Sequence, residues 1–233
     1  MLPSTHRRRL REIWRSAGWP CRDTVEAELL AAGMLNRVVD NAGRESLHVT
    51  DAGVALIAAT VQRNRAARSV HEALVERVAR EMQRSGRVVW RGLSLRAPPL
   101  STGEAAATAW PVAMPDVFSI RHTSVEDYVE PIVHEIKVRR ADLLSDLRHT
   151  AKREAYRALS SQCWYVLKAG IGVAEEIPPE YGVMLAHESR FEVTRPAEQR
   201  AMRLPFMTWM ALARASAEPP LDEDAQGWLH AAD

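Results

Sequence analysis

Residues 114–121 read Met-Pro-Asp-Val-Phe-Ser-Ile-Arg, and residues 128–138 read Tyr-Val-Glu-Pro-Ile-Val-His-Glu-Ile-Lys-Val. Both runs are rich in the β-branched and aromatic residues that favour strands, yet Asp116, Glu135 and Lys137 stand among their apolar residues. Burying charge costs free energy, and a chain carries that cost where the charges hold a metal or do chemistry. This stretch therefore organises the predicted fold and the predicted site.

The spacing of the charged residues predicts how they meet. Glu135 and Lys137 lie two residues apart on one predicted strand, so their side chains share a face. Ile136 points the other way, into the core, but its carbonyl oxygen remains available. If the two strands pair, Asp116 at the start of the first meets Glu135 in the second.

Two carboxylates beside a lysine suit the hydrolysis of a phosphodiester. That reaction needs a divalent ion, a source of hydroxide and positive charge for the pentavalent transition state. Mg²⁺ prefers carboxylate oxygens, backbone carbonyls and waters. In such a site Lys137 would orient or deprotonate the attacking water, or stabilise the phosphate.

The composition narrows the class of protein. The 233 residues are enough for one large domain or two small ones. No run approaches the roughly 18 apolar residues of a membrane helix, and the arginine-rich start lacks the apolar segment of a secretory signal. Cys21 and Cys163 are too few for a disulfide scaffold or a structural zinc site. We therefore expect a cytoplasmic protein with no membrane partner.

The charge is unevenly distributed, although the net charge is only +1. Residues 1–24 hold six arginines against two acidic residues, and residues 137–157 hold seven basic residues against three acidic ones. Residues 217–233 hold five acidic residues and no lysine or arginine. A local basic field attracts a phosphate backbone, whereas the alternative for each basic patch is a solvated helix face.

The first part of the chain resembles a winged-helix module. The patterns predict two helices, a β-hairpin and a third helix, at 5–17, 25–32, 34–50 and from 52 to about 60 or beyond. Winged helices usually place a helix in the major groove of DNA and the wing near the backbone. A protein-interaction or spacer module of the same fold is the alternative. The polar stretch 62–68 is either a linker or a helix extension.

The second part of the chain is predicted to follow the order α-β-β-β-α-β-β. The expected elements are an amphipathic helix at 69–84, strands at 87–91, 116–121 and 128–138, a long helix from 141 to about 159, strands at 162–168 and 181–186, and a helix at 202–215. Residues 97–115, rich in proline and small residues, are expected to form a long, mobile loop over the active cleft. The alternative for the alanines at 105–107 is a short helical turn.

The motifs of this second part resemble the PD-(D/E)xK nuclease superfamily. The resemblance rests on Pro115-Asp116 followed by Glu135-Ile136-Lys137 in that order of elements. Within the superfamily, residues 135–148 resemble the MmcB-type DNA-repair endonucleases, as do Tyr156 and the segments at 162–165 and 177–182. The similarity covers about residues 69–187.

The resemblance implies an α/β (α+β) fold. It consists of a restriction-endonuclease-like αβββαβ core with a mixed central sheet, preceded by a small winged-helix domain. We assign residues 1–65 to the winged-helix-like DNA-binding domain, residues 66–216 to the nuclease domain and residues 217–233 to an acidic, flexible tail.

The resemblance also assigns roles to the site residues. Asp116 and Glu135 would bind Mg²⁺, with Mn²⁺ as the alternative ion, Ile136 would lend its carbonyl, and Lys137 would be catalytic. Many members add a glutamate from the first helix. Glu72 and Glu76 both qualify, because residues four apart share a helix face; we favour Glu72 slightly and leave the choice open.

Other polar residues near the motif have simpler predicted roles. We expect Asp142 and Asp146 to be a helix cap and a solvated acid rather than a metal pair, and His134 to pack rather than bind a metal. Cys163 is expected to be a small buried residue. The predicted phosphate contacts are Arg139, Arg140, Arg148, Lys152 and Arg153.

Together these patterns predict a Mg²⁺-dependent DNA endonuclease that acts on double-stranded DNA in repair or processing. The alternative is a catalytically inactive DNA-binding protein that retains the nuclease fold, and an RNA or nucleotide substrate is a weaker possibility. The sequence makes no prediction of the oligomeric state.

Overall fold

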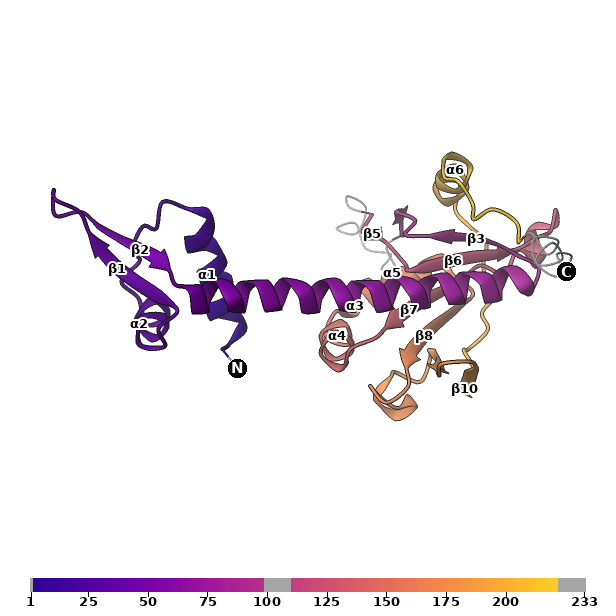
Figure 1. The fold of residues 1–233 in the computed structure, drawn as a ribbon. Coiled ribbons are helices and arrows are strands. Elements are labelled where there is room, and N and C mark those ends of the chain that lie inside the picture. Colours follow the sequence, from indigo (N-terminus) through magenta and orange to yellow (C-terminus); the bar gives the residue numbers. More distant parts are fainter. Residues whose placement is uncertain (1, 99–109, 222–233) are drawn as a thin grey trace, which may run out of the picture. The chain divides into compact units, whose positions relative to one another are not determined.

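A computed structural model describes residues 2–98 and 110–221 of the chain (Figure 1). The chain divides into two compact units, Met1–Arg68 and Ser69–Asp233. The middle of the expected loop, 99–109, and most of the expected acidic tail, 222–233, lie outside the described residues.

The first unit consists of helices and one β-hairpin. Its elements are α1 (Ser4–Arg15), α2 (Thr24–Ala31), β1 (Leu35–Val39), β2 (Glu45–Val49) and the beginning of α3 (Asp51–Arg84). Asp23 caps α2 by accepting a hydrogen bond from the Glu26 amide, the role that short acidic side chains have at N-caps. The buried residues of its core are Leu10, Ile13, Leu29, Leu35 and Leu47.

Helix α3 is one continuous element of 34 residues. The polar stretch 62–68 is therefore a helix extension, and the linker alternative is wrong. This stretch contains alanine, arginine and glutamine and neither glycine nor proline, so its helix propensity is high. Within the described parts of the chain, no helix combines the length and the apolar character that crossing a membrane requires.

A six-stranded sheet of mixed orientation forms the centre of the second unit. The strand order is β10-β9-β8-β7-β6-β3. Strand β7 (Ile132–Lys137) is antiparallel to β6 (Val117–Arg121) and parallel to β8 (Gln162–Lys168). The other strands are β3 (Arg87–Arg91), β9 (Gly182–Ala186) and β10 (Phe191–Arg195). The mixed α and β class and the mixed sheet are as predicted, whereas β10 was not predicted.

Helices cover both faces of this sheet. Val75 and Val78 of α3 share one buried cluster with Val117, Ile136 and Val166 of the strands. On the other face, the helices α4 (Arg140–Asp146), α5 (Thr150–Leu159) and α6 (Phe206–Arg214) belong to a second cluster with alternate strand residues. Residues of β7 therefore alternate between the α3 side and the side of α4 and α5.

The helix expected from residue 141 to about 159 is divided in two, so that prediction is wrong. Helix α4 ends at Asp146, and α5 begins at Thr150. The guanidinium group of Arg153 donates to the backbone carbonyls of Leu147, at 2.5 Å, and Asp146, at 3.3 Å. A basic side chain that bonds the last carbonyls stabilises a helix end, and here it lets the chain turn.

Two more segments differ from the expected pattern. The strand expected at 128–138 begins only at Ile132, because a 3₁₀ turn at Glu126–Tyr128 and Pro131 precede it. The described ends of the expected loop form a short antiparallel pair, β4 (Leu95–Arg96) and β5 (Val112–Ala113). A further 3₁₀ turn occupies Ala174–Glu176.

His134 of β7 is packed inside the sheet, as predicted. Its ring stacks on Trp164, with the ring centroids 6.4 Å apart, and only 1% of the residue is exposed. Burial, together with the positive charge of Arg87, lowers the pKa of His134 to about 3. The imidazole is therefore neutral in the folded protein, whereas in the unfolded chain it titrates near 6.5.

We predict that His134 makes the second unit sensitive to mild acid. Because the folded-state pKa is depressed, the stability it contributes is complete above pH 6.5 and is lost as the pH falls towards 3. At pH 5 the loss should be about 2 kcal/mol. Urea unfolding followed by tryptophan fluorescence at pH 7 and pH 5 measures this loss of stability.

Two variants test whether His134 is the cause. His134→Leu should remove most of the difference in stability between pH 7 and pH 5, whereas His122→Leu, at an exposed histidine, should not. Equal pH dependence in both variants would contradict the assignment.

Candidate active site

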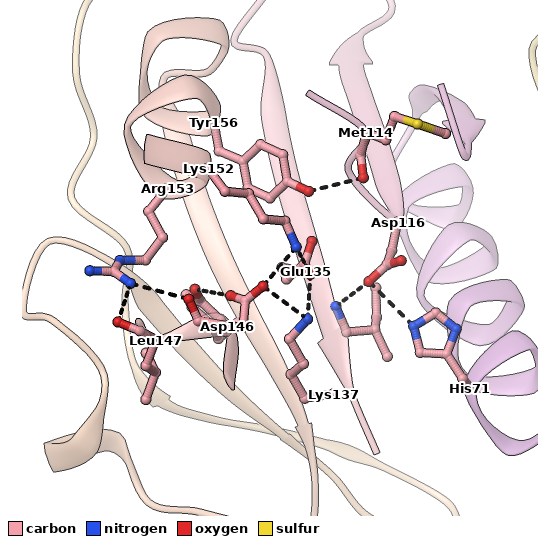
Figure 2. Close-up of polar contacts among 12 residues, drawn as sticks. His71, Met114, Asp116, Glu135, Lys137, Asp146, Leu147, Lys152, Arg153 and Tyr156 are labelled. Atoms are coloured by element: carbon pink, nitrogen blue, oxygen red, sulfur yellow. Dashed lines mark hydrogen bonds and ion pairs between the residues drawn. The ribbon is translucent and has the colours of Figure 1, made fainter. Parts of the chain in front are cut away.

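The charged residues of β7 lie beneath helices α4 and α5. Glu135 and Lys137 are 4% and 9% exposed, and the ammonium group of Lys137 donates to Oε1 of Glu135. Ile136 between them is in the cluster on the α3 side. Figure 2 shows Glu135 and Lys137 side by side, so the prediction that they share a face is confirmed. The prediction that Ile136 enters the core is confirmed as well.

Asp116 adjoins β7 from the neighbouring strand. Val117 of β6 lies opposite His134, and continuing this antiparallel register by one residue places Asp116 opposite Glu135. Oδ2 of Asp116 accepts a hydrogen bond of 2.7 Å from the amide of Ile136. The strand pairing therefore brings Asp116 to the Glu135-Ile136-Lys137 segment.

Asp146 and the partly exposed Lys152 join Glu135 and Lys137 in a cluster of four charges. The Lys152 ammonium lies 2.6 Å from Oε1 of Glu135 and 2.7 Å from Oδ1 of Asp146. Lys137 lies 3.3 Å from the same Asp146 oxygen. The hydroxyl of Tyr165 donates to Oδ2 of Asp146 at 2.7 Å. Asp146 is only 7% exposed, so the prediction that it is a solvated acid is wrong.

The charges of the cluster shift the pKa values of Asp146 and Lys152 towards the ionised forms. Burial favours neutral Asp146, but the charge of Lys137 and hydrogen bonds from Lys152 and Tyr165 lower the pKa of Asp146 below its usual value. Burial likewise opposes charge on Lys152, but the Glu135 carboxylate and the hydrogen bond to Asp146 raise the pKa of Lys152. Two carboxylates and two ammonium groups leave the cluster without net charge, which reduces the cost of burying it.

Tyr156 of α5 links this cluster to the segment before Asp116. Its hydroxyl donates a 2.9 Å hydrogen bond to the carbonyl of Met114. Burial and the charges of Glu135, Asp116 and Asp146 raise the pKa of Tyr156. The phenol therefore remains protonated and serves as a donor that fixes the backbone two residues before Asp116.

His71 of α3 is a site residue that the sequence did not reveal. Its Nε2 lies 3.4 Å from Oδ2 of Asp116, and its hydrogen bond to that carboxylate raises the pKa of His71 above the ordinary value. His71 directly precedes Glu72, on the helix from which a site residue was expected. A histidine next to a glutamate is nevertheless a common pair, so the sequence alone did not single out His71 as a site residue.

Glu72 and Glu76 have different surroundings. A cavity of about 410 Å³ has Glu72 and Asp116 in its wall, and its lining comprises His71, Glu72, Val75, Arg91, Gly92, Asp116 and Glu218. Glu76 is outside that lining and forms an ion pair with Arg80 of its own helix. Of the two candidates, Glu72 is the one that shares a cavity wall with Asp116.

The predicted phosphate contacts are engaged to different degrees. Lys152 belongs to the charge cluster, and Arg153 bonds the end of α4. Arg140 forms an ion pair with Glu176. Arg148 is exposed, and Arg139 is half-buried at the N-cap of α4. The role of these five residues in binding DNA stays a prediction.

The carboxylates present are compatible with a magnesium ion. The described ranges 2–98 and 110–221 contain no group of three or more histidine, cysteine or acidic residues arranged around a metal position. Mg²⁺, however, usually takes one or two carboxylates and completes its shell with waters and substrate phosphates. Among the described residues, Oε2 of Glu135 is buried and has no hydrogen-bond partner, and Asp116 is on the adjacent strand. Asp116 and Glu135 would thus be the carboxylate ligands.

We predict that Asp146 is necessary for the stability of the site. Asp146→Asn removes a charge that faces both lysines, and an uncompensated buried charge should destabilise the second unit by about 3 kcal/mol at pH 7. Asp142→Asn makes the same change on the exposed side of α4 and should have little effect. Chemical denaturation of the two variants measures the difference. Equal stabilities would show that Asp146 does not hold the cluster.

Comparisons with known proteins add one structural similarity. No family model matches the chain, and no curated protein matches it. A solved structure of a protein of unknown function from Silicibacter pomeroyi is 21% identical, with a TM-score of 0.41. The match covers 66% of this chain and 84% of that chain.

Proposed function

We propose that the protein is a Mg²⁺-dependent DNA endonuclease of the PD-(D/E)xK type, resembling the MmcB-type repair endonucleases. The αβββαβ part of the second unit would be the nuclease core, and the first unit would be a winged helix that engages duplex DNA. Its function would lie in DNA repair or processing.

One observation carries this proposal. Glu135 and Lys137 lie on β7, Asp116 directly precedes its partner strand β6, and the Asp116 carboxylate accepts a hydrogen bond from the amide of Ile136 between the other two. Each charge alone is common on a protein surface, but here Glu135 and Lys137 are almost fully buried. Buried charged side chains with specific partners, next to a carboxylate that lines a cavity, are typical of functional sites.

The residues divide the chemistry among themselves. A bound Mg²⁺ would polarise the phosphoryl oxygen and make a bound water more acidic. Asp116 and Glu135 would supply the carboxylates that hold it. The ammonium group of Lys137 would donate to the attacking water or to the phosphate, whose charge grows in the transition state. Asp146 and Lys152 would hold the side chains of Lys137 and Glu135 in position through their ion pairs.

The first unit has features suited to a nucleic acid. Its hairpin β1-β2 forms a two-stranded sheet of its own, as the wing of a winged helix does. Arg8, Arg15 and Arg22 are exposed basic residues of this unit, and exposed Trp19 lies in the turn between α1 and α2. Such residues contact phosphates and sugars, which position a protein on DNA without reading its sequence.

A catalytically inactive DNA-binding protein is the second candidate. The observation that favours it is that Oε1 of Glu135 already accepts hydrogen bonds from the ammonium groups of both Lys137 and Lys152. Two ammonium groups compete with a metal ion for this carboxylate. In that case the cluster would serve the stability of the fold alone, and DNA would be bound but not cut.

We predict metal-dependent nicking of supercoiled plasmid DNA that requires the site. Asp116→Asn keeps an oxygen to accept the Ile136 hydrogen bond but loses the charge, and Lys137→Ala loses the ammonium group. Each should lower the nicking rate by about 100-fold or more, the cost of removing a group that acts on the transition state. Gel electrophoresis of plasmid incubated with Mg²⁺ or Mn²⁺ measures the rate.

Matched exposed residues provide the controls. Lys168→Ala removes an exposed lysine at the end of β8, and Glu188→Gln removes an exposed carboxylate; both should retain wild-type rates. Circular dichroism melts establish that all variants are folded. Cleavage that survives in both folded site variants would refute the assigned site, whereas binding without cleavage by the wild-type protein under both ions would favour the inactive alternative.

A further inference from the structure

The cavity beside Asp116 contains an anion-binding group whose partner comes from the far end of the chain. Arg91, the last residue of β3, lines this cavity with Asp116 and Glu72. Its Nε donates to Oε1 of Glu218 at 2.8 Å. The two residues are 127 positions apart in the sequence, so no local sequence pattern singled out either of them.

The segment that supplies Glu218 is attached along an open sheet edge. Strand β3 is the edge strand of the six-stranded sheet. The amide of Glu218 donates to the carbonyl of Val89 in β3 at 2.8 Å, and the side chain of Gln83 donates to the carbonyl of Pro219 at 2.6 Å. Pro219 and Pro220 have no amide hydrogen, so neither can donate the next bond to the edge strand. The segment around Glu218 is therefore hydrogen-bonded to the edge strand over only a short length.

The Arg91 guanidinium is a suitable site for a phosphate group. Guanidinium groups bind carboxylates and phosphates through the same paired N–H donors. The Arg91 side chain is 37% exposed, and that of Glu218 is 22% exposed. The Glu218 carboxylate thus shows that an oxyanion fits against Arg91 in the cavity shared with Asp116. An ion pair of such exposure contributes little to stability, so a multivalent anion can replace the carboxylate.

We propose that Arg91 binds a backbone phosphate of DNA next to the Asp116 site, and that the Glu218 carboxylate occupies this position until DNA displaces it. The inference rests on the proposed function, because it assigns a substrate contact to the same site. It also gives the acidic C-terminal segment a role, since one of its carboxylates competes with the substrate. Arg91 is a binding residue in this scheme and takes no part in bond cleavage.

Binding of a fluorescein-labelled duplex of about 20 base pairs to the full chain, measured by anisotropy in EDTA, tests this proposal without cleavage. Glu218→Gln should bind about two- to fivefold more tightly, the range expected from the loss of a weak exposed ion pair. Glu188→Gln, which removes one exposed carboxylate of the same unit, controls for net charge and should change affinity less.

The dependence of affinity on salt identifies the phosphate contact itself. Arg91→Gln should weaken binding and reduce the slope of log K against log salt by about 1. Adding Glu218→Gln to Arg91→Gln should then have no further effect, because the carboxylate no longer competes for a guanidinium. Urea unfolding of each variant separates these effects from loss of folding.

The outcomes separate the two proposals. DNA binding by the wild-type protein with an unchanged slope in Arg91→Gln, or with no tighter binding by Glu218→Gln than by Glu188→Gln, overturns this inference and leaves the endonuclease proposal standing. Absence of DNA binding by every variant also overturns this inference, and the plasmid-nicking assay with Mg²⁺ or Mn²⁺ then decides the endonuclease proposal separately. The predicted changes without any metal-dependent cleavage support the Arg91 contact in a protein that binds DNA but does not cut it.

Discussion

The cluster of Glu135, Lys137, Asp146 and Lys152 is the interaction on which the packing of β7 against α4 and α5 depends. Glu135, Lys137 and Asp146 are buried, and each loses several kcal/mol of hydration free energy on burial, which the opposite charges around it offset. Strand β7 supplies one carboxylate and one ammonium group, and helices α4 and α5 supply the other two. The requirement for charge balance thus couples the sheet to the helices that cover it.

The cluster also determines which side of the site is available to a ligand. Oε1 of Glu135 is bound by the two lysines, whereas Oε2 has no partner among the described residues. Asp116 lies at the open side, where the cavity reaches His71 and Arg91. The site therefore has a neutral, buried interior and a carboxylate and basic groups at its opening. This arrangement suits an anionic substrate whose charge is met in part by a metal ion and in part by side chains.

Much of this arrangement was predictable from local pattern, and the exceptions have a physical cause. The alternation of strand residues predicted that Glu135 and Lys137 share a face, and the apolar runs predicted the central strands. The role of Asp146 was not predictable, because in an unbroken helix Asp142 and Asp146 share a face. Arg153 bonds the carbonyls at the end of α4, and Lys137, Lys152 and Tyr165 contact the buried carboxylate of Asp146. Such tertiary partners leave no periodic signal in the sequence, and neither does the pairing of Arg91 with Glu218.

The central claim is that Asp116 and Glu135 together hold a divalent ion. A crystal structure of the protein soaked in Mn²⁺, with anomalous diffraction to locate the ion, tests this claim most directly. The account predicts one anomalous peak within bonding distance of both carboxylates, with Lys137 adjacent to the ion's waters and Glu72 the helix residue nearest to it. A peak bound by other residues, or full-occupancy crystals with no peak at Asp116 and Glu135, would contradict it.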